Sequence, residues 1–351
     1  MKMKKVMAAI IVTLFLASIL STAILLVRAS PAEIRVPSDY STIQAAIDAA
    51  SPGDTIIVEA GTYNERVYID KTLTLLGAKH GEDARTRATT GESVIDWPLG
   101  PVQIVADNVV LDGFTIQGAT ISPTIDPSAL GDGIWTNPGY WGGHGGYTIV
   151  NNIVQNNIIG LCPASDGLYP TVIQYNLFQY NNMPGPAGGN GIYTDFGLHD
   201  ATIDSNTFIE NSMLIFFASD LTISDNLMMG GGMGLLSTSI VSISGNTILP
   251  NTGSDAIWLG GGNDGVTITG NTLQDATGHG ILVDNEWGIG PNANIEVHCN
   301  SIQGNSLGGL IVDTGDYTEP PLDATYNWWG DASGPYHPTL NPSGLGNQVS
   351  D

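Results

Sequence analysis

The sequence predicts an all-β solenoid, in which short parallel strands wind into successive coils. Three observations lead to this fold class. A motif of the form Ile-x-x-Asn recurs every 20 to 30 residues, segments of strand length and alternating hydropathy lie between its copies, and no repeat unit has the length or pattern of a helix. Repeats of this length without helices are typical of parallel β-solenoids, whereas propeller blades need longer units.

The first 29 residues read as an export segment. Three lysines precede an apolar run over residues 6–27, which ends at Arg28 and the small residue Ala29. This arrangement is typical of a signal peptide cleaved before Ser30. The run is also long enough to span a bilayer, so a retained N-terminal anchor is the alternative. In both cases we expect residues 33–351 to be secreted or displayed on the outer face of the cell.

The solenoid proper is expected over 33–351, with an N-terminal cap at 33–54 and a closing segment at 324–351. Residues 41–50 form the one convincing helix, since Ile43, Ala46 and Ile47 share an apolar face and Pro52-Gly53 stops it. We expect this helix to cover the exposed strand edges of a first coil made by 55–59, 66–69 and 72–76.

The repeating asparagine is expected to be structural. Its copies are separated by 24, 30, 20, 20, 25, 29 and 27 residues, at Asn152, Asn176, Asn206, Asn226, Asn246, Asn271, Asn300 and Asn327. At the bend between two strands an asparagine adopts left-handed backbone geometry more readily than most residues. Its side-chain amide can also bond the asparagine of the next coil, which predicts a ladder along the axis. Cys162 and Cys299 lie about five coils apart, roughly 24 Å at about 4.8 Å per coil, so no disulfide is expected.

A second recurring pattern, Gly-Ile-x-apolar, predicts an aromatic surface. If the Ile points inward, the next residue points outward. The outward column then contains Trp135, Cys162, Tyr193, Phe216, Leu236, Trp258, Leu282 and Ile311. Two positions further on, a second outward column contains Asp195, Asp284 and Asp313. Exposed aromatic faces flanked by carboxylates suit neutral sugar rings, unless the loops between strands cover them.

Three segments carry a resemblance to known proteins. The stretch from Tyr40 to Ala50 and the following Gly53–Glu65 resemble the opening of pectin-methylesterase-like β-helix proteins. The later Asn repeats resemble the wider pectate-lyase-like superfamily, including its carbohydrate-binding and sugar-hydrolysis repeat proteins. The segment Asn327–Pro335 is similar to the closing motif of many secreted members. The resemblance implies a right-handed parallel β-helix of roughly ten coils with an N-terminal capping helix.

The resemblance does not carry a family activity over to this chain. Pectin methylesterases and pectate lyases both use an arginine, and no arginine follows Arg87. Polygalacturonase-like hydrolases have a Gly-His-Gly motif, which occurs here at Gly278-His279-Gly280. Aligning neighbouring repeats places Asp255 and His279 in one column of adjacent coils, about 5 Å apart. They are candidate acid and base residues of a glycan hydrolase, although a turn Asp beside a turn His is the simpler explanation of the pattern.

Charge excludes several partners. The chain has 10 Lys+Arg against 34 Asp+Glu, and every basic residue precedes position 88. Phosphate recognition depends on Arg and Lys, so nucleic acid is excluded as a partner, and unaided binding of polyanionic sugars is disfavoured. Membrane contact is expected only through the N-terminal segment. No cofactor is expected to be required. Calcium is an option through Asp313, Asp316 and Glu319, or through Asp264 beside Asn263, but their spacing matches no known calcium loop.

These observations leave three functions open. The first is binding of carbohydrate or another surface polymer through an aromatic sheet face formed by Trp135, Tyr193, Phe216 and Trp258 with Asp195 and Asp284. The second is a polysaccharide-acting enzyme that uses Asp255 and His279. The third is a structural spacer at the cell surface, whose aromatic stripe is sealed under loops.

Overall fold

A computed structural model of the chain describes residues 30–122, 131–136, 143–195, 197–249, 254–318 and 322–350. The chain divides into two compact units, Met1–Ala32 and Glu33–Asp351. The expected export segment, 1–29, lies outside the described residues. Among the residues that are described, no helix has the length and hydropathy needed to cross a membrane.

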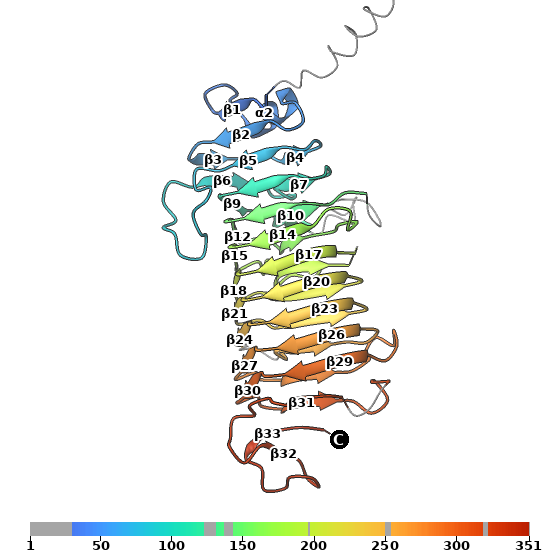
Figure 1. Ribbon diagram of the computed structural model, residues 1–351. Helices are drawn as coiled ribbons and strands as arrows, with labels where there is room; N and C mark the ends of the chain where they lie inside the picture. The colour runs from blue at the N-terminus through green and yellow to red at the C-terminus, as the bar shows by residue number, and fades with distance from the viewer. Residues whose placement is uncertain are drawn as a thin grey trace, which may run out of the picture. The chain divides into compact units, whose positions relative to one another are not determined.

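The second unit is a parallel β-helix, as predicted. Its strands form three long sheets in which every pairing is parallel, and each coil contributes one strand to each sheet (Figure 1). We name these sheets A, B and C in the order in which the chain visits them. Their 11, 10 and 10 strands bear out the expectation of roughly ten coils.

The strand bounds are as follows. Sheet A contains β1 (Glu33–Val36), β2 (Thr55–Val58), β5 (Thr74–Leu76), β8 (Val110–Asp112), β11 (Thr148–Val150), β14 (Thr171–Gln174), β17 (His199–Asp204), β20 (Ser219–Ser224), β23 (Ser239–Ser244), β26 (Asp264–Thr269) and β29 (Ala293–His298). Sheet B contains β3 (Gly61–Tyr63), β6 (Ser93–Asp96), β9 (Phe114–Gln117), β12 (Ile153–Gln155), β15 (Leu177–Gln179), β18 (Thr207–Ile209), β21 (Leu227–Met229), β24 (Thr247–Leu249), β27 (Thr272–Gln274) and β30 (Ser301–Gln303).

Sheet C contains β4 (Val67–Ile69), β7 (Val102–Ile104), β10 (Asp132–Thr136), β13 (Ile159–Cys162), β16 (Asn190–Thr194), β19 (Ser212–Phe216), β22 (Met233–Leu236), β25 (Ile257–Leu259), β28 (His279–Val283) and β31 (Gly308–Val312). A small two-stranded sheet, β32 (Pro335–Tyr336) and β33 (Gly346–Gln348), lies in the closing segment.

The predicted capping helix is confirmed as α2 (Ile43–Ala49). The Thr42 hydroxyl accepts a hydrogen bond from the Ala45 amide, so Thr42 is the N-cap. Ile43, Ala46 and Ile47 are fully buried against the first coil. The helix therefore protects one end of the solenoid from edge-to-edge pairing.

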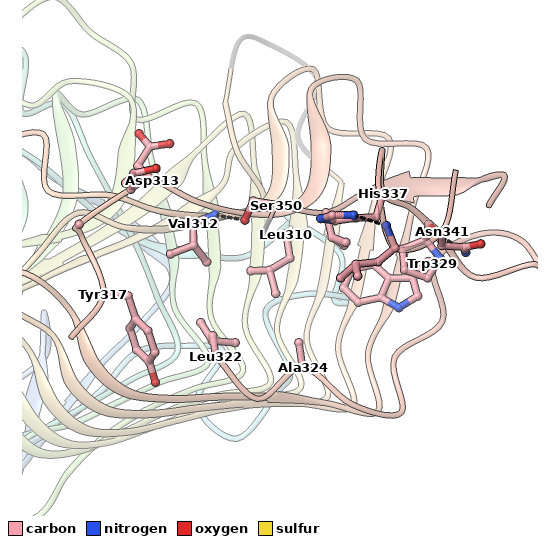
Figure 2. Close-up of a pocket in the computed structure, with 15 residues that line it drawn as sticks. Leu310, Val312, Asp313, Tyr317, Leu322, Ala324, Trp329, His337, Asn341 and Ser350 are labelled. Carbon is pink, nitrogen blue, oxygen red and sulfur yellow. Dashed lines mark hydrogen bonds between the residues drawn. The ribbon is translucent and has the colours of Figure 1, made fainter. Parts of the chain in front are cut away.

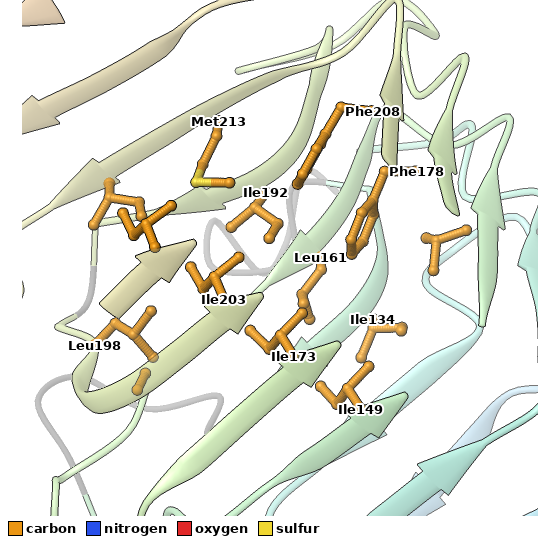
Figure 3. Close-up of a cluster of buried hydrophobic side chains, with 14 of the residues drawn as sticks. Ile134, Ile149, Leu161, Ile173, Phe178, Ile192, Leu198, Ile203, Phe208 and Met213 are labelled. Carbon is orange, nitrogen blue, oxygen red and sulfur yellow. The ribbon is translucent and has the colours of Figure 1, made fainter. Parts of the chain in front are cut away.

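The core runs inside the three sheets as stacked rows of equivalent side chains. Figure 3 shows one such region, where Ile149, Ile173 and Ile203 from successive strands of sheet A face Leu161, Ile192 and Met213 from sheet C. Phe178 and Phe208, from adjacent strands of sheet B, stack with their ring centroids 5.0 Å apart. Because each row repeats from coil to coil, one buried apolar residue per coil is enough to build each row of the core.

The asparagine ladder is present at the corner between sheets A and B. In each step one Oδ1 atom accepts bonds from both the backbone amide and the side-chain amide of the preceding asparagine. The bonds join Asn152, Asn176, Asn206, Asn226, Asn246, Asn271, Asn300 and Asn327 in order, at 2.9–3.3 Å.

One expectation about this ladder was wrong. The left-handed residue at the corner is not the ladder asparagine but the residue before it, such as Tyr175 (φ 56°), Ser205 (φ 54°) and Asp225 (φ 51°). The kink at that position turns the chain and directs the following asparagine inward. There its side chain meets the next coil, and any L-residue that tolerates the left-handed region can occupy the kink.

Candidate binding site on sheet C

The strand register places most of the predicted aromatic column on the outer face of sheet C. Trp135 pairs with Cys162, and Trp258 pairs with Leu282, which in turn pairs with Ile311. Phe216 and Leu236 were assigned to the wrong column. Tyr193 pairs with Leu214, which pairs with Gly234, so Phe216 and Leu236 lie two residues further along, in the column that continues to Asp284.

The misassignment has a physical cause. In β19 a serine, Ser212, precedes the inward Met213, whereas a glycine precedes the equivalent residue in β16 and β22, and the register between β16 and β19 shifts between Asn190 and Ile192. As a result Met213 rather than Ile215 occupies the core position opposite Ile192. Both columns point outward, so Phe216 remains on the same face as the other aromatic residues.

The described residues of this column differ in exposure. Trp135 is 5% exposed and Cys162 is fully buried, whereas Tyr193 and Trp258 are partly exposed. Burial, together with the negative charges of Asp132 and Asp195, raises the pKa of the Cys162 thiol well above its usual value. Cys162 and Cys299 are both free, as expected from their separation. Trp135 is therefore separated from the accessible aromatic residues by the buried Cys162, which lies between Trp135 and Tyr193 in the column.

Four rings form a continuous cluster on the open part of sheet C, which we call the aromatic cluster: Tyr193, Phe216, Trp258 and Trp287. Tyr193 contacts Phe216 at a centroid distance of 5.7 Å, Phe216 contacts Trp287 at 5.3 Å, and Trp287 contacts Trp258 at 6.1 Å, all edge-to-face. Trp287 is 57% exposed, whereas Phe216 is only 3% exposed beneath its neighbours. The cluster thus offers an indole to solvent above a packed aromatic base.

Trp287 was missed by the sequence analysis because it belongs to a loop rather than to a repeat position. The loop joins β28 to β29 and is fixed at its base, where the Asn292 side-chain amide donates to the Asp284 carbonyl at 2.8 Å. The Gly290 amide donates to Asn285 Oδ1 at 3.0 Å, and the Gly262 amide of the preceding coil donates to the Gly290 carbonyl at 2.8 Å. These bonds hold the loop beside the preceding coil.

Two predicted carboxylates flank the aromatic cluster. The Tyr193 hydroxyl donates to Asp195 Oδ2 at 3.1 Å, and the Trp258 indole N–H donates to Asp284 Oδ1 at 2.9 Å. Desolvation by burial raises the pKa of both carboxyls, and for Asp284 the charges of Glu286 and Asp313 act in the same direction. Each end of the cluster therefore has a hydrogen-bond acceptor fixed by an aromatic donor.

Asp255 and His279 lie together on adjacent coils. Asp255 Oδ1 is 2.8 Å from His279 Nδ1 and also accepts the His279 backbone amide at 2.7 Å, and both side chains are about one-fifth exposed. Asp255 lies three residues before Trp258 of the aromatic cluster, and His279 lies five residues, about 16 Å of strand, before Asp284. The geometry fits both a hydrogen-bonded turn and an acid/base pair.

The candidate calcium ligands are described only in part. Among the described residues, no three His, Cys, Asp or Glu side chains are arranged to hold a metal ion. Asp264 instead accepts a hydrogen bond from the Asn294 side chain at 2.6 Å, and Glu319 lies outside the described residues.

A large cavity lies elsewhere, at the C-terminal end of the core. Figure 2 shows it between the last coil and the closing segment, with a volume of about 910 Å³. Its walls are the inward side chains that a further coil would cover, including Leu310, Val312, Leu322, Trp329 and Val349. It is an opening of the core, and none of the residues predicted for carbohydrate binding lines it.

Three solved structures that align with this chain are of carbohydrate-acting proteins. The A-module of the Azotobacter vinelandii mannuronan C-5 epimerase AlgE6 aligns with a TM-score of 0.50 and 17% identity, over 84% of this chain and 95% of that one. The catalytic unit of a thermostable GH87 α-1,3-glucanase from Streptomyces thermodiastaticus strain HF3-3 aligns with a TM-score of 0.40 and 14% identity, over 83% and 67%. Pectate lyase Pel9A aligns with a TM-score of 0.39 and 13% identity, over 87% and 82%.

At these identities the likeness concerns the fold alone. No curated protein matches the sequence. The family model described as the right-handed β-helix region matches residues 132–319, more than half of the chain. This match confirms the handedness implied by the sequence resemblance. The chain therefore belongs to the right-handed parallel β-helix family.

Proposed function

We propose that this protein binds an uncharged polysaccharide on the outer face of sheet C. The observation that carries the proposal is the aromatic cluster with a fixed carboxylate at each end. An exposed indole offers an apolar face on which a sugar ring stacks, and carboxylate oxygens accept hydrogen bonds from sugar hydroxyls. Tyr193 and Trp258 lie three strands apart in sheet C, so a polymer aligned with the solenoid axis contacts several coils at once.

Charge supports a neutral ligand over an acidic one. Positions 88–351 hold every residue of the cluster and no Lys or Arg. A uronate polymer would meet Asp195, Asp284, Glu286 and Asp313 without a cation to neutralise them. We further propose that the segment 1–29 exports the protein, so that it meets its polymer outside the cell.

The test is affinity electrophoresis of the full chain through gels containing neutral polysaccharides, with carboxymethylated forms of the same polymers beside them. We expect retardation by at least one neutral polymer and weaker retardation by its carboxylated form. Trp287→Ala and Trp258→Ala should remove the retardation. Trp328→Ala is the matched control, because Trp328 is 46% exposed outside the aromatic cluster. Equal retardation of all variants, or of none including the parent, would contradict the proposal and favour the spacer.

One observation supports an enzymatic alternative: Asp255 and His279 are in contact at 2.8 Å. A carboxylate that orients a histidine is a common acid/base arrangement. If this pair is catalytic, reducing ends should appear when the protein is incubated with polysaccharide, and Asp255→Asn should abolish them. Release that persists in Asp255→Asn would reject this pair.

A further inference from the structure

Highly exposed apolar side chains are concentrated at the C-terminal end of the solenoid. Four large ones in the last coil and the closing segment are 61–87% exposed: Leu307, Tyr326, Leu340 and Leu345. Elsewhere in the described part of the chain, only Leu168 and Ile240 fall within that range. Apolar side chains exposed together on a soluble protein usually mark an interaction surface. The C-terminal end is therefore a candidate interface.

The cavity at this end stays open although an apolar side chain lies at its mouth. Leu340 lines the cavity of about 910 Å³, yet it is 83% exposed. The closing segment is tied back on itself beside the cavity (Figure 2), where the Asn341 side-chain amide donates to the Ser333 and Pro335 carbonyls at 2.9 and 2.8 Å. The Leu345 amide also donates to Ser333 Oγ at 2.8 Å. These bonds hold both leucines at the rim, so they do not fill the cavity.

The N-terminal end of the same core is already covered. Ile43, Ala46 and Ile47 of α2 are fully buried over the first coil. The outer face of α2 is polar, since the Gln44 side chain donates to the exposed Asp48 carboxylate at 2.9 Å. Head-to-tail stacking would therefore place a polar face against the cavity, whereas two C-terminal ends present the same apolar surface to each other. A surface that binds itself forms a closed, two-fold dimer.

We propose that a second copy of this chain covers the C-terminal cavity, in a two-fold dimer joined end to end. Leu340 of each copy lies over the cavity of the other, and Leu345 packs at the rim. This inference goes beyond the proposed function and does not depend on carbohydrate binding. If both hold, one dimer carries two aromatic clusters, which raises its avidity for a polymer that reaches both.

The end face is small, so the dimer should be reversible. The last strands of sheets A and C, β29 and β31, have six and five residues, which corresponds to lengths of about 20 Å and 16 Å. A face of these dimensions is on the order of 300 Å² per copy. Doubling it for the closing segment gives about 1,200 Å² over two copies, the lower limit of a stable interface. We therefore expect a weak dimer that forms in the micromolar range.

Charge opposes the dimer and makes it depend on salt. Asp313 lines the cavity, and Asp323 lies between two lining residues, Leu322 and Ala324. Both aspartates are exposed, and no Lys or Arg follows residue 87 to pair with them. Two facing copies bring these carboxylates together. Repulsion between exposed charges extends about 10 Å in 0.1 M salt but only about 3 Å in 1 M salt, so concentrated salt should strengthen the dimer.

The test is sedimentation equilibrium of the full chain across the micromolar range, in dilute and in molar salt. We expect the mass to rise from monomer to dimer, at lower protein concentration in molar salt. Leu340→Asp combined with Leu345→Asp should raise the dissociation constant at least about tenfold, because it places charge in the apolar contact. Leu168→Asp combined with Ile240→Asp is the matched control, with similarly exposed positions on other coils, and should leave the dimer unchanged. Ala324→Leu, which fills the cavity from within, should also weaken association.

The comparison isolates the C-terminal end, because any self-association through residues 6–27 is common to both double variants. A parent that stays monomeric at every protein and salt concentration overturns the inference. Equal dimerisation of both double variants also overturns it, and so does assembly beyond a dimer that depends on Leu340 and Leu345. A monomer whose Tm rises with n-octanol would show that a small apolar molecule occupies the cavity instead. Circular dichroism of each variant separates loss of association from loss of fold.

Discussion

The two ends of the solenoid cover the hydrophobic core in different ways. At the N-terminal end, α2 closes the core, and the Glu65 carboxylate accepts the Ile43 and Gln44 amides at 2.9 Å each, which fixes the start of the helix. At the C-terminal end, the closing segment leaves the cavity of about 910 Å³ shown in Figure 2. A helix covers a coil completely, whereas a strand and loops cover only its edges.

The same contrast extends along the chain. Near residue 88 a buried cation joins neighbouring coils: Arg87 pairs with Glu92 at 2.8 Å, both side chains are almost fully buried, and the guanidinium also donates to the Phe114 and Asn151 carbonyls. Beyond residue 88 no cation is present, and uncharged amides join one coil to the next. An acidic protein without lysine or arginine can therefore build a long stack, provided that every buried amide finds a partner.

The largest effect on stability is expected at the buried Arg87–Glu92 ion pair. Arg87→Met should lower the free energy of unfolding by about 3–5 kcal/mol, because Glu92 is left buried and unpaired. Arg87→Met combined with Glu92→Gln should recover much of this loss. Urea unfolding followed by circular dichroism measures both. Arg85→Met, at a pair whose side chains are about 30% exposed, is the control and should cost at most about 1 kcal/mol. If Arg85→Met and Arg87→Met lower the free energy of unfolding equally, burial of the Arg87–Glu92 pair does not increase its contribution to stability.

The amide ladder should be nearly as sensitive. Asn226→Ala removes the oxygen that accepts both the Asn206 backbone amide and its side-chain amide, at 2.9 and 3.0 Å. Leaving these buried donors unpaired should lower the free energy of unfolding by about 2–4 kcal/mol. Asn182→Ala, at an exposed position, should change it by less than about 0.5 kcal/mol. A loss below 1 kcal/mol at Asn226 would mean that the ladder follows the fold without stabilising it.

One substitution made at both ends compares them directly. Ala46→Leu adds volume under α2, where Ala46 is fully buried, and should destabilise the protein by about 1–3 kcal/mol. Ala324→Leu adds the same volume to the wall of the C-terminal cavity and should raise stability by about 0.5–2 kcal/mol. Thermal unfolding of the two variants measures the difference. The same sign of change at both ends would contradict the contrast.

The smallest expected effect concerns Asp284. Its pKa in the folded protein is raised by burial, so the folded state holds the proton to higher pH than the unfolded state does. The protein should therefore lose stability as pH rises through this range and gain none from Asp284 at neutral pH. Asp284→Asn should raise the Tm relative to the parent at pH 7, with the difference shrinking at acidic pH. A difference independent of pH would contradict the raised pKa.

Most of the fold could be predicted from the sequence repeat. One inward residue and one asparagine per coil recur at recognisable spacings, so the parallel solenoid and the ladder could be predicted from the sequence. The capping helix could be predicted from its own apolar face and from the Pro-Gly pair that ends it. A second ladder, from Asn157 through Asn181 to Asn211 at the corner between sheets B and C, has the same bonds at 2.9–3.3 Å. It spans only three coils, too few to stand out as a repeat.

The candidate site was less predictable. Tyr193 and Trp258 occupy repeat positions, and their outward direction follows from the Ile beside them. Phe216 was placed two residues out of register because β19 lacks the flanking glycine, and Trp287 could not be placed because the path of its loop depends on tertiary hydrogen bonds. Asp284 and Asp313 were recognisable as one column, but the contact with the Trp258 indole appears only once the side chains are placed.

The most direct measurement is oxidation of the tryptophans by N-bromosuccinimide, followed by mass spectrometry, with and without the retained neutral polysaccharide. Trp287 and Trp328 are similarly exposed, 57% and 46%, so they report on two faces of one molecule. If polymer binds at the aromatic cluster, Trp287 and Trp258 should be oxidised more slowly in its presence while Trp328 is unaffected. Protection of Trp328 alone, or no protection of Trp287 at saturating polymer, would contradict a binding site on sheet C.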